Sequence, residues 1–369
     1  MPQTISRIKV NLPLRGYEVL IKGGLLRETG KHLARLVGPR KSLFVITAAP
    51  VRRKWGKALM DSLAAADFPA RLIEMPDGEP HKKLATVELL AEKLTRFGAE
   101  RGSVILAFGG GVVGDVAGLV ASLYMRGVSA VQIPTTVLAQ VDASIGGKTG
   151  VNLRTGKNLL GTFHQPLAVL IDPSVLATLS EREFRAGLYE SLKCGVIGNP
   201  ELFRRLEKIQ IKSLRKDADG LEWIIAESAR LKAKIVSADE RESGLRRVLN
   251  FGHTIGHALE AESNYRRFLH GEAVAWGMIA AVTIAAETGR LNQQTADRIT
   301  HAVLALGPLP KVTARGRKIL KLLQTDKKTA NGKVNFVLPT QIGHVEIVND
   351  VPDALIVKAV DALRKHSLA

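Results

Sequence analysis

Cysteine is nearly absent from this sequence of 369 residues, in which Cys194 stands alone. A single thiol cannot form a disulfide within the chain, so we expect a fold that needs none and a reducing compartment, the cytoplasm. The first ten residues, MPQTISRIKV, lack the apolar core of a secretory signal peptide. A chain of this length can hold about two domains and bury a large core without cross-links.

Long apolar runs are also missing. The least polar stretch, residues 104–125, contains Asp115 and several glycines. Charge and glycine are poorly suited to a lipid-spanning helix. We therefore predict a buried strand, a loop and a helix in this stretch, and no membrane partner.

Acidic residues are in the minority, with 35 Asp and Glu against 53 Lys and Arg, and the formal net charge is +18. Aromatic residues make up only 5% of the chain, and the basic residues are scattered among predicted helices. This pattern lacks the basic stripe with interleaved aromatics that is typical of nucleic-acid-binding proteins, so we expect no nucleic-acid partner. A strongly anionic small substrate would profit from the same positive field.

Strand signals dominate the first half of the chain. As far as residue 178, short β-branched runs alternate with amphipathic segments, which predicts an α/β fold with a mainly parallel sheet. The first two runs are equally compatible with an antiparallel edge. The predicted strands lie in RIKVNL, YEVLIKGG, SLFVITAAP, ARLIEMPDG, SVILAFGGG, AVQIPTT and LAVLIDP.

Helical periodicity dominates from Glu181 to the end of the chain, where KVNFVLP is the remaining strand signal. No repeat, low-complexity tract or flexible linker interrupts the sequence. We therefore predict two domains, an α/β domain over residues 1–178 and a mainly helical domain over residues 179–369.

A glycine-rich segment, VILAFGGGVVGDVAGLV, is typical of a buried strand that turns into a helix. Glycines at such a turn let backbone N–H groups approach a phosphate at the helix N-terminus. Residues 109–114 match G-x-G-x-x-G, but no acid lies about 20 residues further on, as a dinucleotide fingerprint requires. A tight strand-to-helix turn explains the glycines equally well.

The next segment, residues 133–166, concentrates polar side chains on glycine-rich connections. Hydroxyls, amides and amines of this kind suit phosphates and sugar hydroxyls. Apolar anchors such as Val151 and Leu159 argue against a merely solvated loop, so we interpret the segment as part of a ligand site. Its polar candidates are Thr135, Thr136, Asp142, Lys148, Lys157, Asn158 and His164.

Two histidines, His253 and His257, lie four positions apart in LNFGHTIGHALE and share one face of a predicted helix. A HExxH metalloprotease needs Glu after the first His, and Thr254 stands there instead, so this is not a protease motif. Spacing alone would place both histidines on one metal ion.

Further ligand candidates lie nearby in the sequence. His270 and Glu272 follow in LHGEAVAWGM, and Glu190 shares a helix face with Lys193 in an earlier segment. Together with the histidine pair they offer more than enough nitrogen and oxygen ligands for a zinc-like ion with an open position. Histidines that only cap helices or form hydrogen bonds remain the alternative.

Six blocks, in this order and at these separations, resemble the 3-dehydroquinate synthase family. They are GGGVVGDVAG, IPTTVLAQVDASIGGKTGVN, GKNLLGTFHQP, ESLKCGVI, LNFGHTIGHALE and HGEAVAWGM. The resemblance extends from PDGEPHK near residue 80 to DKK near residue 328. It implies a Rossmann-like NAD-binding domain followed by an all-helical metal-binding domain, usually in a homodimer.

The resemblance also implies the reaction. A phosphorus–oxygen lyase of the shikimate pathway would convert 3-deoxy-D-arabino-heptulosonate 7-phosphate into 3-dehydroquinate and phosphate, with catalytic NAD and Zn²⁺ or Co²⁺. Two alternatives share the architecture. One is another sugar-phosphate cyclase, of the 2-deoxy-scyllo-inosose or valiolone type, whose substrate lacks a carboxylate. The other is a metal-dependent oxidoreductase of the glycerol dehydrogenase type, which releases its reduced nicotinamide at each turnover.

Residue roles follow from the matching blocks. The resemblance implies that the metal is bound by Glu190, His253 and His270, and that His257 faces the substrate instead. The implied catalytic residues are Asp142, Lys148, Lys193, Asn250 and His257. The implied substrate-binding residues are Asn158, Lys232, Arg246 and the pair Lys327 and Lys328. NAD would contact Glu79, Lys82, Gly110, Gly111, Asp115, Thr135, Thr136, Lys148, Lys157 and Thr178.

Two positions depart from the family pattern. Tyr189 and Cys194 stand where the resemblance predicts smaller or different residues, which affects the expected local packing but not Glu190 or Lys193.

Overall fold

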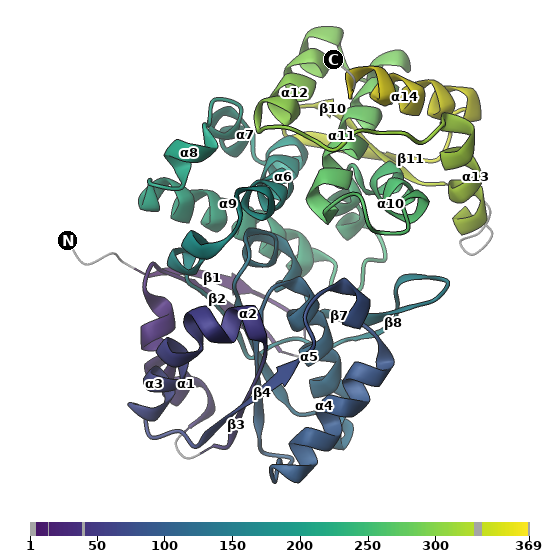
Figure 1. Ribbon diagram of the computed structural model, residues 1–369. Coiled ribbons are helices and arrows are strands. Elements are labelled where there is room, and N and C mark those ends of the chain that lie inside the picture. Colours follow the sequence, from purple (N-terminus) through teal and green to yellow (C-terminus); the bar gives the residue numbers. More distant parts are fainter. Residues whose placement is uncertain (1–4, 14, 39–40, 328–333, 368–369) are drawn as a thin grey trace. The chain divides into compact units, whose positions relative to one another are not determined.

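The computed structural model describes residues 5–13, 15–38, 41–327 and 334–367 (Figure 1). The chain forms two compact units, each built from two segments. The first comprises Met1–Ser180 and Asp217–Arg241, and the second comprises Glu181–Lys216 and Glu242–Ala369. The sequence-based boundary after residue 178 lies close to Ser180, but the predicted second domain also included helix α9 (Ala218–Ala238), which belongs to the first unit.

A seven-stranded sheet forms the centre of the first unit, with the strand order β1-β2-β9-β6-β5-β3-β4. Strand β1 pairs with β2 in antiparallel fashion, and every other neighbouring pair is parallel, which confirms the predicted fold class and the antiparallel edge. The strands are β1 (Ser6–Val10), β2 (Tyr17–Ile21), β3 (Leu43–Ala48), β4 (Ala70–Met75), β5 (Val104–Gly109), β6 (Ser129–Pro134) and β9 (Ala168–Ile171).

Helices cover both faces of this sheet. Successive side chains of a strand point to opposite faces. In β3, Phe44 and Ile46 accordingly belong to one core cluster, which includes residues of α4 and α5, whereas Leu43 and Val45 belong to another, which includes residues of α1 and α3. Burial on both faces explains why β3 and β5 are nearly continuous apolar runs. The covering helices are α1 (Thr29–Val37), α3 (Lys57–Ala64), α4 (Leu84–Arg96) and α5 (Gly111–Leu123).

The strand order reverses direction between β3 and β5. From β3 the chain moves outward to β4, whereas β5, β6 and β9 continue toward the other edge. In open α/β sheets, ligands bind at the carboxyl ends of the strands at such a reversal point. The glycine-rich turn follows β5 and therefore lies at the position that favours a nucleotide.

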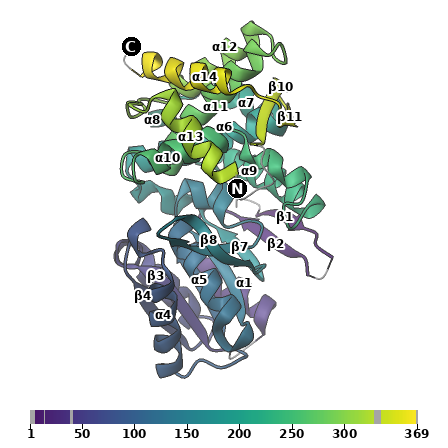
Figure 2. The same ribbon diagram turned by 90° about the vertical axis from the view of Figure 1, so that its right-hand side faces the viewer.

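A β-hairpin, β7 (Lys148–Leu153) and β8 (Gly156–Phe163), lies beside α5 in both Figures 1 and 2. The sequence interpretation treated this segment as glycine-rich connections and missed the two strands. Close contact explains one of the glycines of α5, because a Cβ on Gly118 would lie 2.6 Å from Cγ2 of Thr149.

The second unit is mainly helical. Helix α11 is buried along nearly its whole length and contacts α6, α10, α12 and α14, which makes it the central element of the unit. The helices are α6 (Glu181–Gly198), α7 (Pro200–Leu206), α8 (Ile211–Leu214), α10 (His253–Glu262), α11 (His270–Glu287), α12 (Gln293–Ala305), α13 (Gly316–Lys327) and α14 (Asp353–His366).

An antiparallel pair, β10 (Phe336–Gln341) and β11 (His344–Val348), completes the second unit. KVNFVLP predicted the first of these strands, but the second was not predicted, so the unit is not all-helical. Tyr189 and Cys194, the two departures from the family pattern, are both buried in α6, and the Tyr189 hydroxyl donates a hydrogen bond of 3.4 Å to the carbonyl of Gly307. None of the helices in the described part of the chain is long and apolar enough to cross a membrane.

Candidate active site

The glycine-rich turn brings four predicted cofactor residues together in the first unit. Gly110 precedes the first residue of α5, Gly111, and the amide of Thr135 donates a hydrogen bond of 2.9 Å to the carbonyl of Gly109. A Cβ on Gly110 would lie only 3.0 Å from Cγ2 of Thr136. The turn therefore packs closely against the residues after β6 and presents the N-terminus of a 13-residue helix, which favours an anion.

A buried lysine organises the polar groups beside this turn. The amine of Lys82 donates hydrogen bonds to the carboxylate of Asp115 and to the amide oxygen of Asn158. Lys82 is buried, so its charge requires such partners. Burial raises the pKa of the Asp115 carboxyl, and the neighbouring Lys82 amine opposes this shift.

Asn152 extends this network and was not among the predicted residues. Its Nδ2 donates a hydrogen bond of 2.8 Å to Oε1 of Glu79, and its Oδ1 accepts one of 2.9 Å from the backbone amide of Asn158. The amine of Lys157 lies 3.6 Å from the same oxygen of Glu79. Asn152 thus links predicted cofactor-binding and substrate-binding residues. Its position in the predicted ligand segment was the available signal.

A second buried lysine of this unit, Lys232 on α9, contacts Asp142. Its amine donates hydrogen bonds of 2.7 Å to both the main-chain oxygen and Oδ1 of Asp142. Asp142 lies in a short π-helical turn, Ala139–Ala143. The structure therefore brings together one predicted catalytic residue and one predicted substrate-binding residue.

Two predicted cofactor residues have other surroundings. Lys148 begins β7 and its side chain is exposed. The hydroxyl of Thr178 accepts a hydrogen bond of 3.0 Å from Nε1 of Trp55. Within the described ranges, no hydrogen bond joins Thr178 to the network around Lys82.

Three elements of the second unit bring the predicted metal ligands together. Glu190 lies in the middle of α6, His253 begins α10 and His270 begins α11. Oε1 of Glu190 lies 3.8 Å from Nε2 of His253 and 3.5 Å from Nε2 of His270. Residues that are far apart in the sequence thus converge on one point.

The surroundings of these groups fit a divalent cation. Nδ1 of His253 donates to the carbonyl of Phe251 at 3.1 Å, and Nδ1 of His270 lies 3.3 Å from Oε2 of Glu260, so both rings direct Nε2 toward Glu190. Glu190 is fully buried, and its Oε1 accepts no hydrogen bond from any residue that the structure describes. A buried carboxylate oxygen of this kind, beside two imidazole nitrogens, is suited to a zinc-like ion.

His257 lies beside the same centre. Ligand atoms of His253, His257 and His270 all lie within 4.8 Å of one another, so the distances also permit a three-histidine set. The His257 side chain is exposed, whereas that of His253 is only 12% exposed. Burial lowers the pKa of His253 well below its usual range, and the nearby Lys193 ammonium adds to this effect. A neutral imidazole is the form that binds a metal.

The second unit also contains buried cations, one of which contacts the predicted ligands. The amine of Lys193 pairs with the carboxylate of Glu190, and its side chain is 1% exposed. Arg246 is also 1% exposed, in contrast to the exposed Arg247 beside it. Nδ2 of Asn250 donates a hydrogen bond of 2.8 Å to Oε1 of Glu242. Lys and Arg are rarely buried to this degree in protein interiors unless they are paired, and buried charges are frequent at functional sites.

Family models match most of the chain. The model described as 3-dehydroquinate synthase N-terminal matches residues 72–186, and the model described as 3-dehydroquinate synthase C-terminal matches residues 187–329. The chain belongs to the 3-dehydroquinate synthase family. A 3-dehydroquinate synthase of Koribacter versatilis is 54% identical over 360 residues, which cover 98% of each chain. One of Solibacter usitatus is 47% identical over 352 residues and covers 95% of this chain and 97% of its own.

Solved structures of related cyclases share the fold of this member of the 3-dehydroquinate synthase family. A 2-epi-5-epi-valiolone synthase from Streptomyces hygroscopicus, with NAD⁺ and Zn²⁺ bound, is 32% identical with a TM-score of 0.87, over 96% of this chain and 98% of its own. A 2-deoxy-scyllo-inosose synthase complexed with carbaglucose-6-phosphate, NAD⁺ and Co²⁺ is 24% identical with a TM-score of 0.82, over 98% of this chain and 99% of its own. The second likeness establishes the fold alone.

Several charged residues of the second unit were missed, left without a role in the sequence interpretation or lie outside the described residues. Glu260 was not singled out, although it follows His253 by seven positions on the same helix face. Glu272 was singled out as a ligand candidate, but its two oxygens accept hydrogen bonds of 2.7 Å from Arg182. Lys328 lies outside the described residues, and so does the side chain of Lys327, the last residue of α13.

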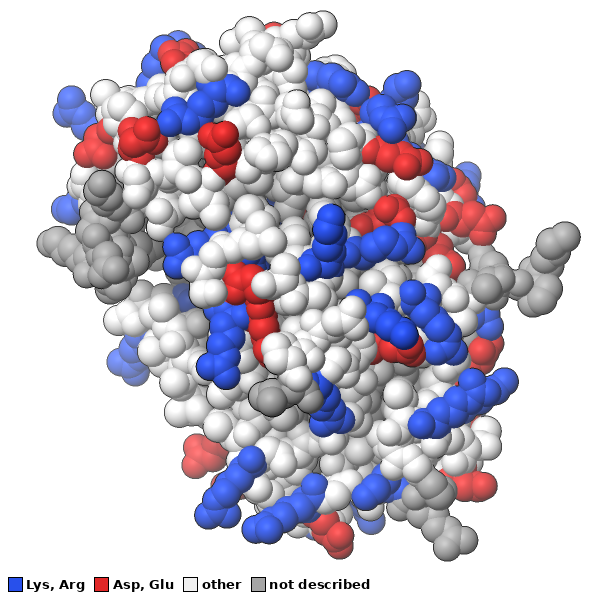
Figure 3. All heavy atoms as spheres, turned by 180° about the vertical axis from the view of Figure 1, so that it is seen from behind, with Lys and Arg blue, Asp and Glu red and all other residues white. Residues whose placement is uncertain are grey.

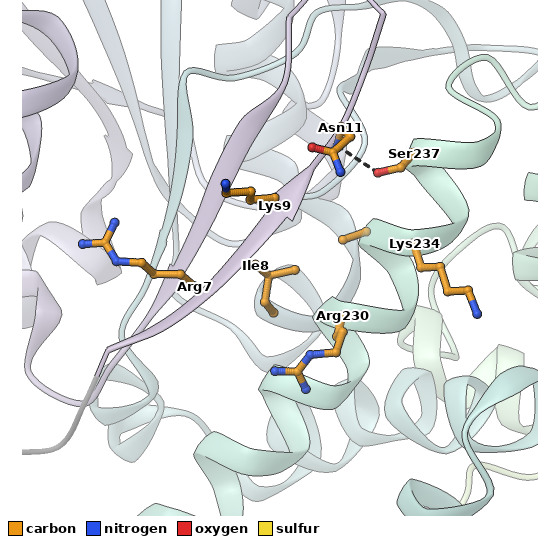
Figure 4. A pocket seen from close by; sticks show the side chains of 8 residues that line it. Arg7, Ile8, Lys9, Asn11, Arg230, Lys234 and Ser237 are labelled. Atoms are coloured by element: carbon orange, nitrogen blue, oxygen red, sulfur yellow. Dashed lines mark hydrogen bonds between the residues drawn. The ribbon is translucent and has the colours of Figure 1, made fainter.

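A basic hollow of about 400 Å³ lies between β1 and α9 and contains none of the predicted site residues (Figure 4). Arg7 and Lys9 border it on the strand, and Arg230 and Lys234 border it on the helix. Figure 3 shows Lys and Arg side chains dispersed among neutral and acidic ones on the face that it depicts. The hollow accounts for four of the 53 basic residues.

Proposed function

We propose that the chain catalyses the 3-dehydroquinate synthase reaction. The substrate is 3-deoxy-D-arabino-heptulosonate 7-phosphate, and the products are 3-dehydroquinate and phosphate. The steps are oxidation with NAD, elimination of phosphate, re-reduction and intramolecular aldol closure. The choice of this reaction rests on one observation. The chain is similar to 3-dehydroquinate synthases over nearly its full length. The metal centre by itself would suit a dehydrogenase equally well.

Glu190, His253 and His270 would hold Zn²⁺ or Co²⁺, as their convergence and the orphaned Oε1 of Glu190 support. Related cyclases contain Zn²⁺ or Co²⁺ together with NAD⁺. A divalent cation at this position polarises the hydroxyl to be oxidised and stabilises developing negative charge. The buried amine of Lys193, paired with Glu190, places a fixed positive charge beside the same oxygens.

NAD would bind at the reversal point of the sheet, and it supplies the hydride chemistry. The N-terminus of α5 and the close packing of its glycines support this placement. The residues of the chain bind and orient the cofactor. We assign this role to Glu79, Lys82, Gly110, Gly111, Asp115, Thr135, Thr136, Lys148, Lys157 and Thr178.

The substrate has two anionic groups, a carboxylate and a phosphate, and buried cations suit both. The planar guanidinium of Arg246 can donate two parallel hydrogen bonds to the carboxylate, and Lys232 can add a point charge. Lys148, Lys193 and His257 would stabilise the charge of the phosphate and move protons at its oxygens, without acting as strong bases. We assign the remaining catalytic roles to Asp142 and Asn250. The remaining substrate-binding roles belong to Asn158 and to the pair Lys327 and Lys328.

The two alternatives are less well supported. A cyclase of the valiolone or deoxy-scyllo-inosose type needs no group for a carboxylate, whereas Arg246 is buried and charged in this chain. A probable glycerol dehydrogenase of known structure is only 17% identical, with a TM-score of 0.63 over 99% of each chain, and shows the fold alone. The relatives of highest identity described above are 3-dehydroquinate synthases.

Compartment, assembly and domain roles belong to the same proposal. The lone, buried Cys194 suits a reducing cytoplasm. We expect a homodimer, as in the family. We assign NAD binding to the domain predicted over residues 1–178, and metal and substrate binding to the domain predicted over residues 179–369. Lys232 on α9 is then a substrate-binding residue that packs with the nucleotide-binding unit.

A direct assay tests this function. The purified protein is incubated with the heptulosonate phosphate, trace NAD and Zn²⁺, and phosphate and dehydroquinate are measured together. We expect equal amounts of both products. A parallel reaction with a heptulose phosphate that lacks the carboxylate should be much slower. Faster turnover of that second substrate would overturn the proposed reaction in favour of another cyclase.

A further inference from the structure

Helix α10 presents three polar residues on one face, and only two of them have a role so far. His253, His257 and Glu260 follow one another at i, i+4 and i+7, which places them in a line along the helix. Glu260 is the most deeply buried of the three, with 1% of its surface exposed. A carboxylate removed from water to this degree is retained where it binds a cation or accepts hydrogen bonds.

The carboxylate of Glu260 faces the second histidine ligand across the helix pair. Its Oε2 lies 3.3 Å from Nδ1 of His270, the first residue of α11. The opposite nitrogen of the same ring, Nε2, lies 3.5 Å from Oε1 of Glu190. The imidazole of His270 therefore stands between two carboxylates and uses one nitrogen for each.

Close backbone packing brings Glu260 to this position. A Cβ on Gly277 of α11 would overlap the carbonyl oxygen of Gly252, and a Cβ on Gly256 of α10 would lie 3.0 Å from the carbonyl oxygen of Ala273. The two helices thus touch along their backbones, which shortens the distance that the Glu260 side chain must span. A Cβ on Gly271 would likewise overlap the carbonyl oxygen of Ala186, so the start of α11 also lies directly against α6.

A second carboxylate fixes the start of α11 without contacting the histidine ring. Oε2 of Glu272 accepts a hydrogen bond of 2.8 Å from the backbone amide of Leu269, which caps the helix at the residue before His270. Both oxygens of Glu272 also accept hydrogen bonds from Arg182, which lies on α6 with Glu190. Glu272 therefore fixes the backbone at the start of α11, whereas Glu260 contacts the ring of His270 itself.

The other histidine ligand is oriented by a weaker acceptor. Nδ1 of His253 donates to a neutral main-chain carbonyl, that of Phe251. A carboxylate acceptor holds one tautomer more strongly than a carbonyl does, and it increases the basicity of the opposite nitrogen. The two imidazoles are thus unequal in their surroundings, and His270 has the stronger partner.

We propose that Glu260 is a positioning residue that holds His270 with its proton on Nδ1 and directs Nε2 toward Glu190 and the bound metal. This inference rests on the proposed metal site. Glu260 contacts neither substrate nor cofactor in this role, and it acts only through the imidazole of His270.

Metal affinity, measured apart from turnover, tests the proposal. Zinc is removed from the full chain, and Zn²⁺ binding is measured by competition with a chromophoric chelator in Glu260→Gln and in the wild-type protein. Substitution of such a partner typically weakens metal binding by about 10- to 100-fold, and we expect a loss in this range. The Co²⁺ form should also show a changed visible spectrum, because the ligand field depends on the orientation of His270.

Glu262→Gln is the matched control. Glu262 lies on the same helix and pairs with Lys318 at 3.0 Å, so this variant also removes one carboxylate charge from α10. Its metal affinity and Co²⁺ spectrum should equal those of the wild type. Equal affinity in Glu260→Gln and Glu262→Gln would overturn the positioning role.

A second variant keeps the outcome decisive. If Glu260→Gln fails to fold, Glu260→Asp gives the same comparison, because it keeps the charge but shortens the side chain by one methylene. A wild-type protein that binds no metal would refute the proposed metal site itself. If the wild type binds metal but no more tightly than Glu260→Gln, only the positioning role of Glu260 is refuted.

Discussion

The amine of Lys232 lies 2.7 Å from Oδ1 of Asp142 and 2.7 Å from its main-chain oxygen. Helix α9 therefore holds the π-helical turn Ala139–Ala143 of the same unit. Lys232→Met removes both hydrogen bonds at a buried position. We expect the free energy of unfolding to fall by about 1 to 3 kcal/mol, and the KM for the heptulosonate phosphate to rise. Urea unfolding and steady-state kinetics measure these effects.

Lys234→Met is the control for this prediction, because Lys234 lies two residues further on the same helix and is exposed. A surface substitution of this kind typically changes stability by less than about 0.5 kcal/mol. Equal losses in the two variants would contradict a specific role for the contact between Lys232 and Asp142.

Removal of the metal should abolish activity. We expect EDTA-treated protein to be inactive, because the proposed oxidation depends on a cation held by Glu190, His253 and His270. Addition of Zn²⁺ or Co²⁺ should restore the activity. His253→Ala and His270→Ala should each lose zinc, measured by elemental analysis of the dialysed protein. Full zinc content and near-normal turnover in either variant would show that the ligand assignment is wrong.

NAD should be required only in catalytic amount. The hydride that is taken from the substrate returns to the same substrate in the proposed reaction, so no reduced cofactor is left over. Absorbance at the NADH band should stay constant while phosphate accumulates. A rise of NADH in proportion to product would support the dehydrogenase alternative.

Variants at Arg246 test which cyclase substrate the chain accepts. Arg246→Ala removes a buried guanidinium that we assign to the carboxylate, a loss that typically costs about 2 to 5 kcal/mol, so kcat/KM should fall by roughly 30-fold or more. Arg246→Lys should recover only part of the activity, since an ammonium lacks the planar fork. The exposed Arg247 provides the comparison. Small and equal effects of alanine at 246 and 247 would refute the carboxylate assignment.

Gly271 tests the close approach of α11 to α6. A methyl group at this position would overlap the carbonyl oxygen of Ala186, so Gly271→Ala should lower the free energy of unfolding by about 1 to 3 kcal/mol and weaken metal binding through His270. Gly102→Ala is the control, because the one atom that lies within 4 Å of a Cβ built there, among the described residues, is Nζ at the flexible end of Lys41. Thermal unfolding of the metal-free forms separates the two effects.

The sequence predicted most of the first unit, and the reason is visible in β3 and β5. Strands that are buried on both faces carry mostly apolar residues, which are easy to detect, and in β3 only Thr47 is polar. The hairpin of β7 and β8 escaped prediction because Gly150, Gly156 and Gly161 interrupt it and its second strand is largely exposed. Helical periodicity predicted that α9 is a helix, but periodicity does not specify which unit a helix packs against.

The residues of the candidate site were also predicted only in part. The resemblance to the family named Glu190, His253 and His270, and the structure brings these three side chains together. Asn152 and Glu260 were not predicted, because each acts through another polar residue and carries no motif of its own. Sequence spacing alone could place Glu260 on the face of His253, but only the packing of two helices brings it to His270.

The path of the chain between the two units has a genetic consequence. The first unit needs Asp217–Arg241 as well as the residues up to Ser180, because α9 supplies Lys232 to Asp142. The same helix also holds the backbone near the edge of the sheet, where the hydroxyl of Ser237 accepts a hydrogen bond of 2.9 Å from the amide of Asn11.

Suppose that recombination between genes of related enzymes exchanged everything after Ser180. Residues 217–241 would then come from a different parent than residues 1–180, although the two stretches pack together in one unit. The codons for residues 217–241 have to be inherited with those for residues 1–180, although the codons for residues 181–216 lie between them. Viable chimaeras of this enzyme should thus inherit residues 217–241 from the same parent gene as residues 1–180, whatever the origin of residues 181–216.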